Sequence, residues 1–198
     1  NGWQYTFLVP HDVEGLIDLF GGKQKFSDKL DSLFTVSSKL NEGASIDISG
    51  MIGQYAHGNE PGHSTIYMYQ YADRPDKTAE RVRQVLSEMY KPTPAGLCGN
   101  DDCGQMSAWY VMSALGIYPM NPVSGEYVFG SPLIDKAVIK TESGRKFTIE
   151  AKNNPTKNIY IKSVELDGKN YKGISLNYNK IIQGGNLKFV MGNKPVKQ

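Results

Sequence analysis

The segment from His57 to His63 combines side chains that serve in metal binding and in acid–base chemistry. Two imidazoles, the Asn59 amide and the Glu60 carboxylate fall within seven residues. Pro61 suits the first position of a helix, so the segment is expected at a helix start. The simplest interpretation is that Asn59 or Glu60 caps that helix while the histidines lie on a polar surface. The alternative is a ligand-binding site.

A second segment, Gly99–Gln105, places the carboxylates of Asp101 and Asp102 side by side. Asp102 and Gln105, three residues apart, fit a helix capping box. Adjacent acids repel each other, which favours a cation or a proton between them. Carboxylates on a loop also serve in metal binding and as general bases. The interpretations are compatible, because one oxygen of Asp102 can cap while the other binds.

Together the two segments offer four oxygen-donor side chains, from Asn59, Glu60, Asp101 and Asp102. Hard oxygen donors suit Ca²⁺ or Mg²⁺ better than Zn²⁺. The two histidines of the first segment suggest zinc instead. Their spacing, however, is not the helical spacing of zinc proteases, and the sequence contains no H-E-x-x-H motif.

The two cysteines, Cys98 and Cys103, flank the acidic pair. They are five residues apart, which is not the C-x-x-C spacing. They either staple this loop in an oxidising compartment or remain as two buried thiols. Neither lies in a recognisable nucleophile motif, so we predict no catalytic role for them.

Aromatic side chains accumulate in and near these segments. Rings beside carboxylates are a common way to bind sugars, although most of these rings are expected to pack in the core. They are Trp3, Tyr5, Phe7, Tyr55, Tyr67, Tyr69, Tyr71, Trp109 and Tyr110.

Apolar residues at helical spacing predict five helices before Gly116. They cover residues 10–20, 26–33, 61–71, 74–89 and about 103–115. An irregular stretch, 41–58, and a Pro/Gly loop, 91–96, separate some of them. Short intervals between helices favour antiparallel neighbours in a bundle or toroid.

After Gly116 the pattern changes to short β-branched or aromatic runs separated by turn residues. The runs are 127–129, 137–139, 147–149 and 159–161. The turn residues are Ser143-Gly144, 153–155, Asp167-Gly168 and Gly184-Gly185. This alternation is typical of hairpins in an antiparallel sheet. Since no βαβ alternation occurs, a doubly wound nucleotide-binding fold is not expected.

Composition bounds the class of protein. The chain has 198 residues, a net charge of +2, 39% hydrophobic residues and 21% charged residues, which fits a folded soluble domain. Residues 1–118 carry a net charge of −5, and residues 119–198 carry +7. The basic excess is dispersed, so nucleic-acid binding is not expected. The sequence predicts no membrane span, and no signal peptide opens the chain at Asn1.

Three long motifs and a β tail make the chain similar to a known family. They are 3–12 (WQYTFLVPHD), 53–61 (GQYAHGNEP) and 99–111 (GNDDCGQMSAWYV), followed by 127–132 and 191–195. In this order they resemble the C-terminal part of glycoside hydrolase family 92. The resemblance implies an α+β fragment: the last helices of an (α/α)6 toroid in residues 1–118, then an antiparallel β module in residues 119–198.

By the same resemblance, the whole enzyme is an inverting, calcium-dependent exo-α-mannosidase. Its active site lies between an N-terminal β-sandwich domain and the toroid. Asp102 matches the carboxylate that activates water and lies at the calcium. Asn59 and Glu60 match calcium-site residues, and Trp3, His57 and His63 match sugar-facing positions.

Two departures from the family pattern affect the catalytic residues. Many members have an acid at the position of Asn100, so Asp101 stays a catalytic candidate beside Asp102 with its part open. The family's general acid, a Glu just before the Trp3 motif, falls outside this chain. An inverting hydrolase needs an acid and a base roughly 6.5–9.5 Å apart. The chain alone is therefore expected to be inactive.

The expected substrate is a terminal α-mannosidic linkage in mannose-rich glycans, with α-1,2 the first choice and α-1,3 its rival. The expected partners are that glycan and the N-terminal domain of the same enzyme. The expected location is periplasmic or extracellular. One alternative is a non-catalytic carbohydrate-binding or scaffold module that uses the β region. Another is a purely structural helical domain.

Overall fold

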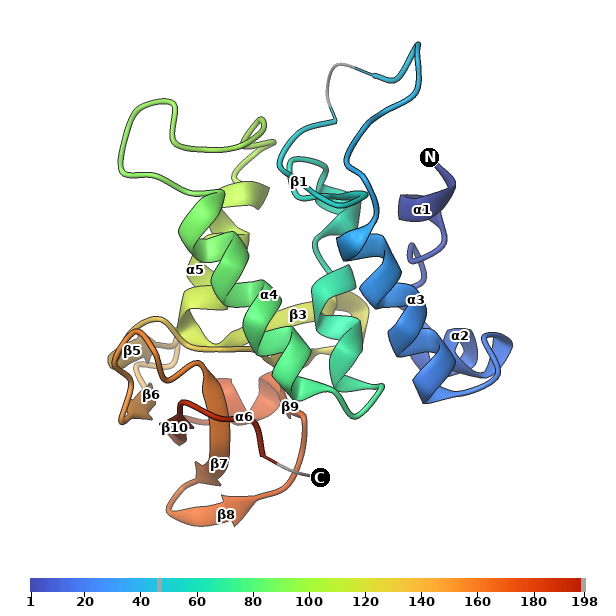
Figure 1. Cartoon of the computed structure of the whole chain (residues 1–198). Helices are drawn as coiled ribbons and strands as arrows, with labels where there is room; N and C mark the ends of the chain where they lie inside the picture. Colours follow the sequence, from blue (N-terminus) through green and yellow to red (C-terminus); the bar gives the residue numbers. More distant parts are fainter. Residues whose placement is uncertain (46–47, 197–198) are drawn as a thin grey trace.

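The computed structural model describes residues 1–45 and 48–196. Residues 46 and 47 of the predicted irregular stretch 41–58, and the last two residues of the 119–198 segment, lie outside the described residues. Helices α4 (Pro75–Glu88) and α5 (Gln105–Leu115) lie side by side, and residues 65–70 separate α4 from α3 (Lys23–Thr35). The strands that follow residue 116 lie at one end of these helices, whereas a short hairpin at residues 51–56 and the long loops that carry the motifs lie at the opposite end (Figure 1).

Four helices follow the predicted apolar spacing, whereas the first helix of the chain lies before any predicted one. Helix α1 covers Gly2–Tyr5, and α2 covers Val13–Leu19, with Asp12 accepting a hydrogen bond from the Gly15 amide at its start. Helix α4 begins at Pro75 and buries the predicted face, including Val82 and Val85. Four of the five predicted helices are therefore confirmed as helices, with shifted ends.

The helix predicted over 61–71 is instead two 3₁₀ turns, η1 (Glu60–Gly62) and η2 (Thr65–Gln70). All six residues of η2 are buried. Burial on every side removes the two-faced pattern that an amphipathic α-helix needs, and successive amides bond three residues back, as from Tyr67 to Ser64. A short hairpin, β1 (Met51–Ile52) with β2 (Tyr55–Ala56), precedes these turns.

A three-stranded sheet follows α5. Its strands are β3 (Ile117–Asn121), β4 (Glu126–Phe129) and β9 (Ser175–Asn177), with the turn η3 (Pro122–Ser124) between the first two. Because side chains alternate along a strand, the sheet serves two cores. Tyr118 and Val128 pack into the helical core, whereas Ile117 and Phe129 pack into the core of the second sheet. The boundary predicted after residue 118 falls inside β3.

The second sheet has five strands in the order β5-β6-β10-β7-β8. They cover Lys136–Lys140, Lys146–Lys152, Gly185–Gly192, Tyr160–Leu166 and Lys169–Tyr171, respectively, and the short helix α6 (Tyr178–Ile182) precedes β10. The hairpins at Ser143-Gly144 and Asp167-Gly168 are confirmed.

The prediction of a purely antiparallel module is wrong at one pair of strands. Strand β10 inserts between β6 and β7 and pairs in parallel with β6, with Gly185 opposite Phe147. The turn residues 153–155 therefore do not close a hairpin. Hairpin signals are local, whereas this insertion depends on a strand that returns from later in the chain.

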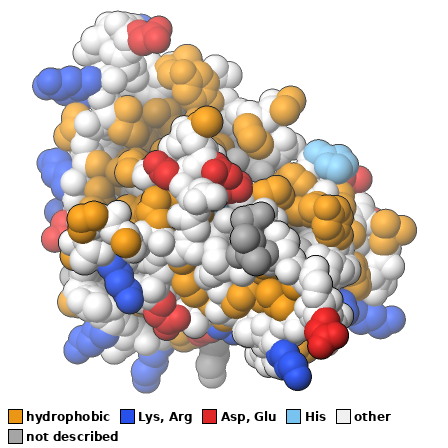
Figure 2. All heavy atoms as spheres, turned by 90° about the horizontal axis from the view of Figure 1, so that it is seen from above, with side chains coloured by type: hydrophobic (Ala, Val, Ile, Leu, Met, Phe, Trp, Pro, Cys, Tyr) orange, Lys and Arg blue, Asp and Glu red, His pale blue; other side chains and the backbone are white. Residues whose placement is uncertain are grey.

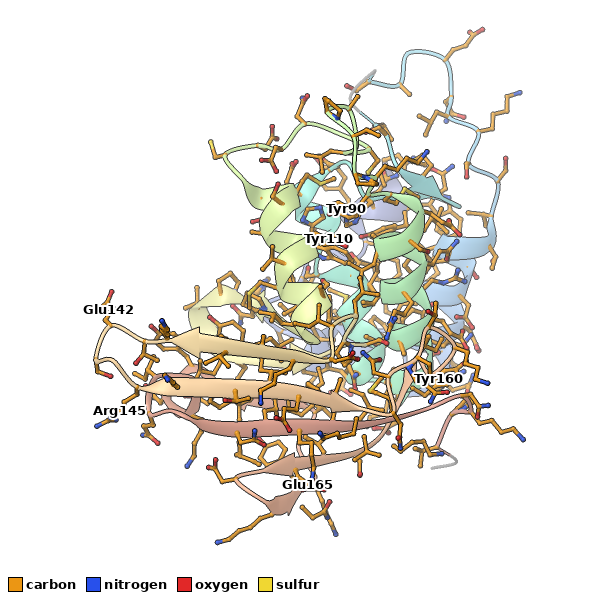
Figure 3. The ribbon with its side chains drawn as sticks, turned by 90° about the vertical axis from the view of Figure 1, so that its left-hand side faces the viewer. Tyr90, Tyr110, Glu142, Arg145, Tyr160 and Glu165 are labelled. Atoms are coloured by element: carbon orange, nitrogen blue, oxygen red, sulfur yellow. The ribbon has the colours of Figure 1, made fainter. Side chains whose placement is uncertain are left out.

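Helix α4 is joined to the sheet region by polar contacts. The Arg83 guanidinium donates to Ser131 Oγ at 2.9 Å, to Asn154 Oδ1 at 3.0 Å and to the Pro132 carbonyl. The Tyr160 hydroxyl, at the start of β7, donates to Glu80 Oε1 at 2.8 Å. In Figure 3, Tyr160 lies where the strands meet the helices, while Tyr90 and Tyr110 lie further up between α4 and α5. These contacts fix the orientation of α4 between the sheet and the loops.

Candidate active site

Two of the motif loops meet through glycine backbones. A Cβ atom at Gly99 would lie 2.8 Å from the Gly58 Cα, and one at Gly58 would lie 3.2 Å from the Cys98 carbonyl oxygen. Only glycine allows the chains to approach this closely. Asn59 and Glu60 come directly after Gly58 in the chain, and Asn100 to Asp102 come directly after Gly99. The loops that hold the predicted oxygen ligands therefore lie against each other, as the ligand hypothesis requires.

Glu60 carries an unusual oxygen at this junction. Its Oε1 is buried without a hydrogen-bond partner, a state it shares, among the residues that the structure describes, only with Ser27 Oγ. Leaving a carboxylate oxygen buried and unpaired is costly, so a bound cation would satisfy it. Asn59 is exposed beside it and makes no side-chain cap, so the capping interpretation of this segment is wrong.

The two carboxylates of the acidic pair, Asp101 and Asp102, have different surroundings. Asp101 Oδ1 accepts a hydrogen bond from the Ser107 amide at 2.9 Å, and the Asp101 carbonyl accepts from the Gly104 and Met106 amides. The Asp102 side chain makes no bond to any described residue and is exposed. The predicted capping box of Asp102 with Gln105 is therefore wrong: Gly104 occupies the N-cap, and Asp101 secures the helix start.

The backbone geometry explains why Asp101, and not Asp102, secures the start of α5. Asp102, Cys103 and Gly104 have φ values of +43°, +57° and +91°, so three successive residues adopt the left-handed conformation. An N-cap residue that bonds the first turn has an extended conformation, which Asp102 does not have. The turn leaves the Asp102 carboxylate free in solvent. Both cysteines are free thiols, Cys98 half-buried and Cys103 exposed, so neither the staple nor the pair of buried thiols is present.

The two histidines lie inside the protein. His57 and His63 are 0% and 1% exposed, and their rings stack with centroids 4.6 Å apart. Burial lowers the pKa of His57 to about 2 and that of His63 to about 4. Neither the predicted polar surface nor an open sugar-facing position agrees with this burial. Their positions in the core assign them to holding the site together.

Hydrogen bonds define the state of the first ring. The Tyr90 hydroxyl donates to the Met106 carbonyl at 2.9 Å, so its oxygen accepts from His57 Nε2 at 2.7 Å. His57 Nδ1 then accepts from the Tyr55 hydroxyl at 2.8 Å. The ring is neutral with its proton on Nε2.

The second ring has the same tautomer. His63 Nε2 donates to the His57 carbonyl at 2.9 Å, and its Nδ1 accepts from Gln105 Nε2 at 3.1 Å. Trp109 Nε1 donates to the His63 carbonyl at 3.2 Å. Sequence reasoning missed Tyr90 and saw Gln105 only as a capping partner, because these contacts join residues far apart in the chain.

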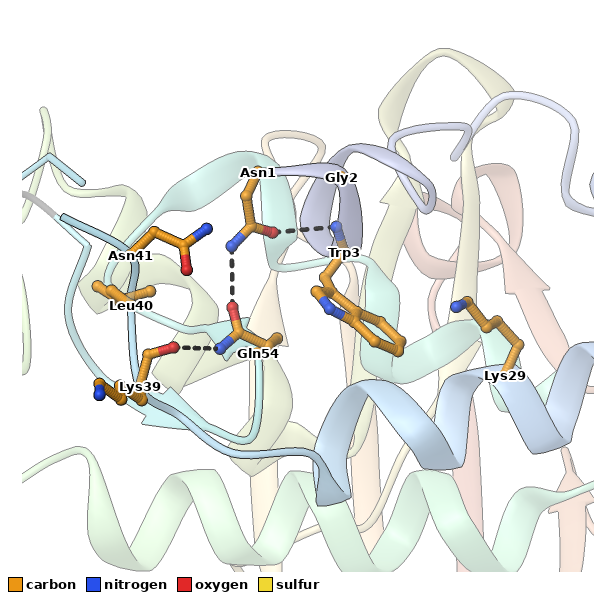
Figure 4. Close-up of a pocket in the computed structure, with 8 residues that line it drawn as sticks. All are labelled: Asn1, Gly2, Trp3, Lys29, Lys39, Leu40, Asn41 and Gln54. Carbon is orange, nitrogen blue, oxygen red and sulfur yellow. Dashed lines mark hydrogen bonds between the residues drawn. The ribbon is translucent and has the colours of Figure 1, made fainter. Parts of the chain in front are cut away.

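Trp3 lines a separate pocket of about 380 Å³ at the N-terminal motif. The Lys29 ammonium lies 3.8 Å from the centre of the Trp3 ring. Figure 4 shows the pocket, where the Asn1 amide donates to Gln54 Oε1 at 2.8 Å. The Gln4 amide donates to the Gln54 carbonyl at 2.7 Å. Buried Gln54 thereby joins the first motif to the second.

A neighbouring cavity of about 410 Å³ lies between the first two motifs. Its lining includes Tyr5, Tyr55 and Asn59. Figure 2 shows the loop end of the molecule from above, where acidic side chains lie near the middle among hydrophobic ones and most Lys and Arg side chains lie toward the edge. All three motifs therefore border the same end of the molecule.

The acidic and amide groups fit a hard cation in part. Within residues 1–45 and 48–196, no three or more His, Cys, Asp or Glu side chains are grouped to hold a metal. The unpaired Glu60 oxygen, the exposed Asn59 amide and the free Asp102 carboxylate are suitable donors for Ca²⁺. Since Ca²⁺ takes six to eight oxygens, other oxygens would complete its shell.

In the described part of the chain, no helix is long and apolar enough to span a membrane.

Solved structures of known proteins share this arrangement. An α-mannosidase of family GH92 from Bacteroides thetaiotaomicron, solved with mannoimidazole, matches with a TM-score of 0.92 and 42% identity. The match covers 98% of this chain and 25% of that one. A GH92 inverting mannosidase from the same organism matches with a TM-score of 0.83 and 36% identity, over 98% and 27% of the two chains. The mixture of helices and mainly antiparallel strands in this chain is therefore that of GH92 structures.

Sequence comparisons agree with the structural ones. An uncharacterized secreted glycosidase of Arthroderma benhamiae is 31% identical over 195 residues, which cover 97% of this chain and 23% of the relative. The chain thus spans about a quarter of the length of the relatives that it matches. The family model described as "Glycosyl hydrolase family 92 catalytic domain" matches residues 1–193 of this chain. With nearly every residue covered, including all three motifs of the loop end, the chain belongs to glycosyl hydrolase family 92.

Proposed function

We propose that this chain is the C-terminal part of a calcium-dependent exo-α-mannosidase, which removes terminal mannose from mannose-rich glycans with inversion, α-1,2 linkages being preferred. The observation that carries the proposal is the contact of Gly58 with Gly99. It joins the loop of Asn59 and Glu60 to the loop of Asp101 and Asp102, beside a buried Glu60 oxygen that has no partner among the described residues. The likeness to two mannosidases, one of them described as inverting, supports the reaction class.

In this proposal Asn59, Glu60 and Asp102 hold the calcium. A bound calcium supplies positive charge that polarises sugar hydroxyls and orients water. Asn59 contributes a neutral oxygen from an exposed loop position, whereas Glu60 contributes the oxygen that the protein itself leaves unpaired. This division explains why a carboxylate is kept partly buried at a loop junction.

Asp102 acts as the general base in the proposed reaction. Its carboxylate accepts a proton from water while the water oxygen bonds to the anomeric carbon and the glycosidic C–O bond breaks. The leaving oxygen takes a proton from an acid that we place before Asn1 in the complete enzyme. Asp101 keeps the turn in place through the Ser107 amide, and Trp3 offers a ring face to sugar. We place the enzyme in the periplasm or outside the cell, as for the relative described as secreted.

Calcium binding tests the proposal directly. Replacing Glu60 by Gln removes the charge but keeps the shape of the side chain, so calcium should bind more weakly and its stabilising effect should fall. At 100 times the dissociation constant, calcium stabilises the parent protein by about 2.7 kcal/mol. Thermal unfolding and calorimetric titration of the complete enzyme, with and without calcium, measure both effects.

Hydrolysis of an aryl α-mannoside provides the second readout. The complete enzyme should lose turnover on chelation and regain it with calcium, whereas the 198-residue chain alone should be inactive. Sugar binding that ignores calcium and maps to the region after residue 118 would instead identify a non-catalytic carbohydrate-binding module. That result, or unchanged calcium affinity in Glu60→Gln, would refute the proposal.

A further inference from the structure

Tyr90 contacts the His57 segment, the end of the 91–96 loop and helix α5. It follows the C-terminal end of α4, and its backbone pairs with Leu97 in an isolated bridge that closes the 91–96 loop. Its hydroxyl accepts from His57 Nε2 and donates to the Met106 carbonyl at the start of α5. One hydroxyl thus links the loop before Asn59 with the helix after Asp102.

The Tyr90 ring strengthens the same link. It stacks on Trp109 with centroids 6.0 Å apart and an angle of 3° between the planes, and it meets His57 edge-on at 5.5 Å. Burial raises the pKa of the Tyr90 phenol above its usual value, so the hydroxyl keeps its proton for the Met106 carbonyl. Since His57 is 0% exposed, loss of the hydroxyl would leave its Nε2 proton buried without this acceptor.

We infer that Tyr90 is a positioning residue for the proposed hydrolase, holding the Asn59–Glu60 loop and the Asp101–Asp102 turn in register through His57 and Met106. This inference rests on the proposed function, since it assigns the two loops to calcium and to the base. Without the hydroxyl, His57 Nε2 and the Met106 carbonyl lose a shared partner on opposite sides of the site. The loops can then shift relative to each other without unfolding the core.

Tyr90→Phe in the complete enzyme tests the inference. We expect calcium, titrated alone, to bind about tenfold more weakly, and kcat to fall about tenfold with KM within about twofold. Tyr67→Phe is the matched control, because Tyr67 is a buried tyrosine whose hydroxyl bonds Ser113 Oγ at 2.8 Å in the core. The control should lower thermal stability while leaving calcium affinity and kcat unchanged.

A second variant keeps the test decisive if Tyr90→Phe folds poorly. Gln105→Met removes the donor to His63 Nδ1 and should weaken calcium binding in the same direction. Normal calcium affinity and kcat in both variants, or equal losses in Tyr67→Phe, would overturn the positioning role while the proposed function stands. Absence of calcium binding by the unsubstituted enzyme would instead refute the proposed function and this inference together.

Discussion

At the scale of single residues, the acidic pair shows how one turn separates two adjacent carboxylates. Asp102 and Cys103 adopt the left-handed conformation, which costs about 1–2 kcal/mol for each non-glycine residue. Such strain concentrates at functional sites. Here it directs Asp101 toward the Ser107 amide and leaves the Asp102 carboxylate without a partner among the described residues. The strain therefore supports assigning the base to Asp102.

Replacing Asp102 by Asn should separate activity from stability. Asn tolerates the left-handed conformation, and the Asp102 side chain makes no bond to any described residue, so the melting temperature measured without calcium should stay nearly unchanged. Loss of the base should lower kcat by about 10²–10⁴-fold. Steady-state kinetics on an aryl α-mannoside and thermal unfolding of the complete enzyme measure the two effects.

Asp101→Asn is the matched control for that substitution. The amide oxygen can still accept from the Ser107 amide, so kcat and stability should both remain close to those of the parent. A kcat near normal in Asp102→Asn, or a loss in Asp101→Asn as large as in Asp102→Asn, would contradict the assignment.

At the scale of elements, the helices and hairpins that depend on a local sequence pattern could be predicted. The apolar spacing of Val13, Leu16 and Ile17 predicts α2, and Ser143-Gly144 predicts the β5–β6 hairpin. The 3₁₀ form of η2 could not be predicted in this way, because burial on all sides is set by packing. The parallel β6–β10 pair was missed for a similar reason, since its partners are separated by the rest of the sheet.

In the candidate site, too, the local motifs could be predicted and the long-range contacts could not. The loops of Asn59, Glu60 and Asp102 carry recognisable motifs, and they do meet. Burial of His57 and His63 was not foreseen, because their partners Tyr90 and Gln105 lie on other elements. Which acid secures α5 depends on the φ of Asp102, which the spacing to Gln105 does not reveal.

Gly99→Ala should force the two motif loops apart. A Cβ there meets the Gly58 backbone at 2.8 Å, and backbone atoms cannot move aside as a flexible side chain can. Overpacking of this kind costs about 1–3 kcal/mol. We expect a lower free energy of unfolding together with weaker calcium binding, measured by denaturant unfolding and by titration of the complete enzyme.

Gly2→Ala supplies the comparison for this prediction. Gly2 begins α1, and a Cβ there has no atom within 4 Å. It should leave both quantities unchanged or raise stability slightly. Equal behaviour of the two alanine variants would show that the glycine contact does not hold the loops.

At the scale of the whole molecule, buried phenols link the core to pH. Tyr67 and Tyr118 stack with centroids 4.9 Å apart in the helical core. Burial raises the pKa of Tyr118 to about 12 and that of Tyr67 further still. Both phenols stay protonated in the folded chain at a pH where the unfolded chain ionises them.

Stability should therefore fall on the alkaline side. The contribution of these phenols is fully present below pH 10, the ordinary pKa of tyrosine, and is lost as the pH rises toward 12. Two such groups lower the free energy of unfolding by up to about 2.7 kcal/mol per pH unit. Denaturant unfolding between pH 8 and 11.5 measures the slope. A flat profile, or tyrosinate absorbance from all 12 tyrosines near pH 10 with native near-UV dichroism, would contradict it.

The anchoring of Arg83 has a consequence for exchanging parts between relatives. All three acceptors of its guanidinium come from residues after 130, while Arg83 itself belongs to α4. A chimera joined at residue 118 would cut through β3 and place this cation against the hydrogen-bond acceptors of another protein. Recombination within the family should therefore transfer α4 and everything that follows it as one inherited block.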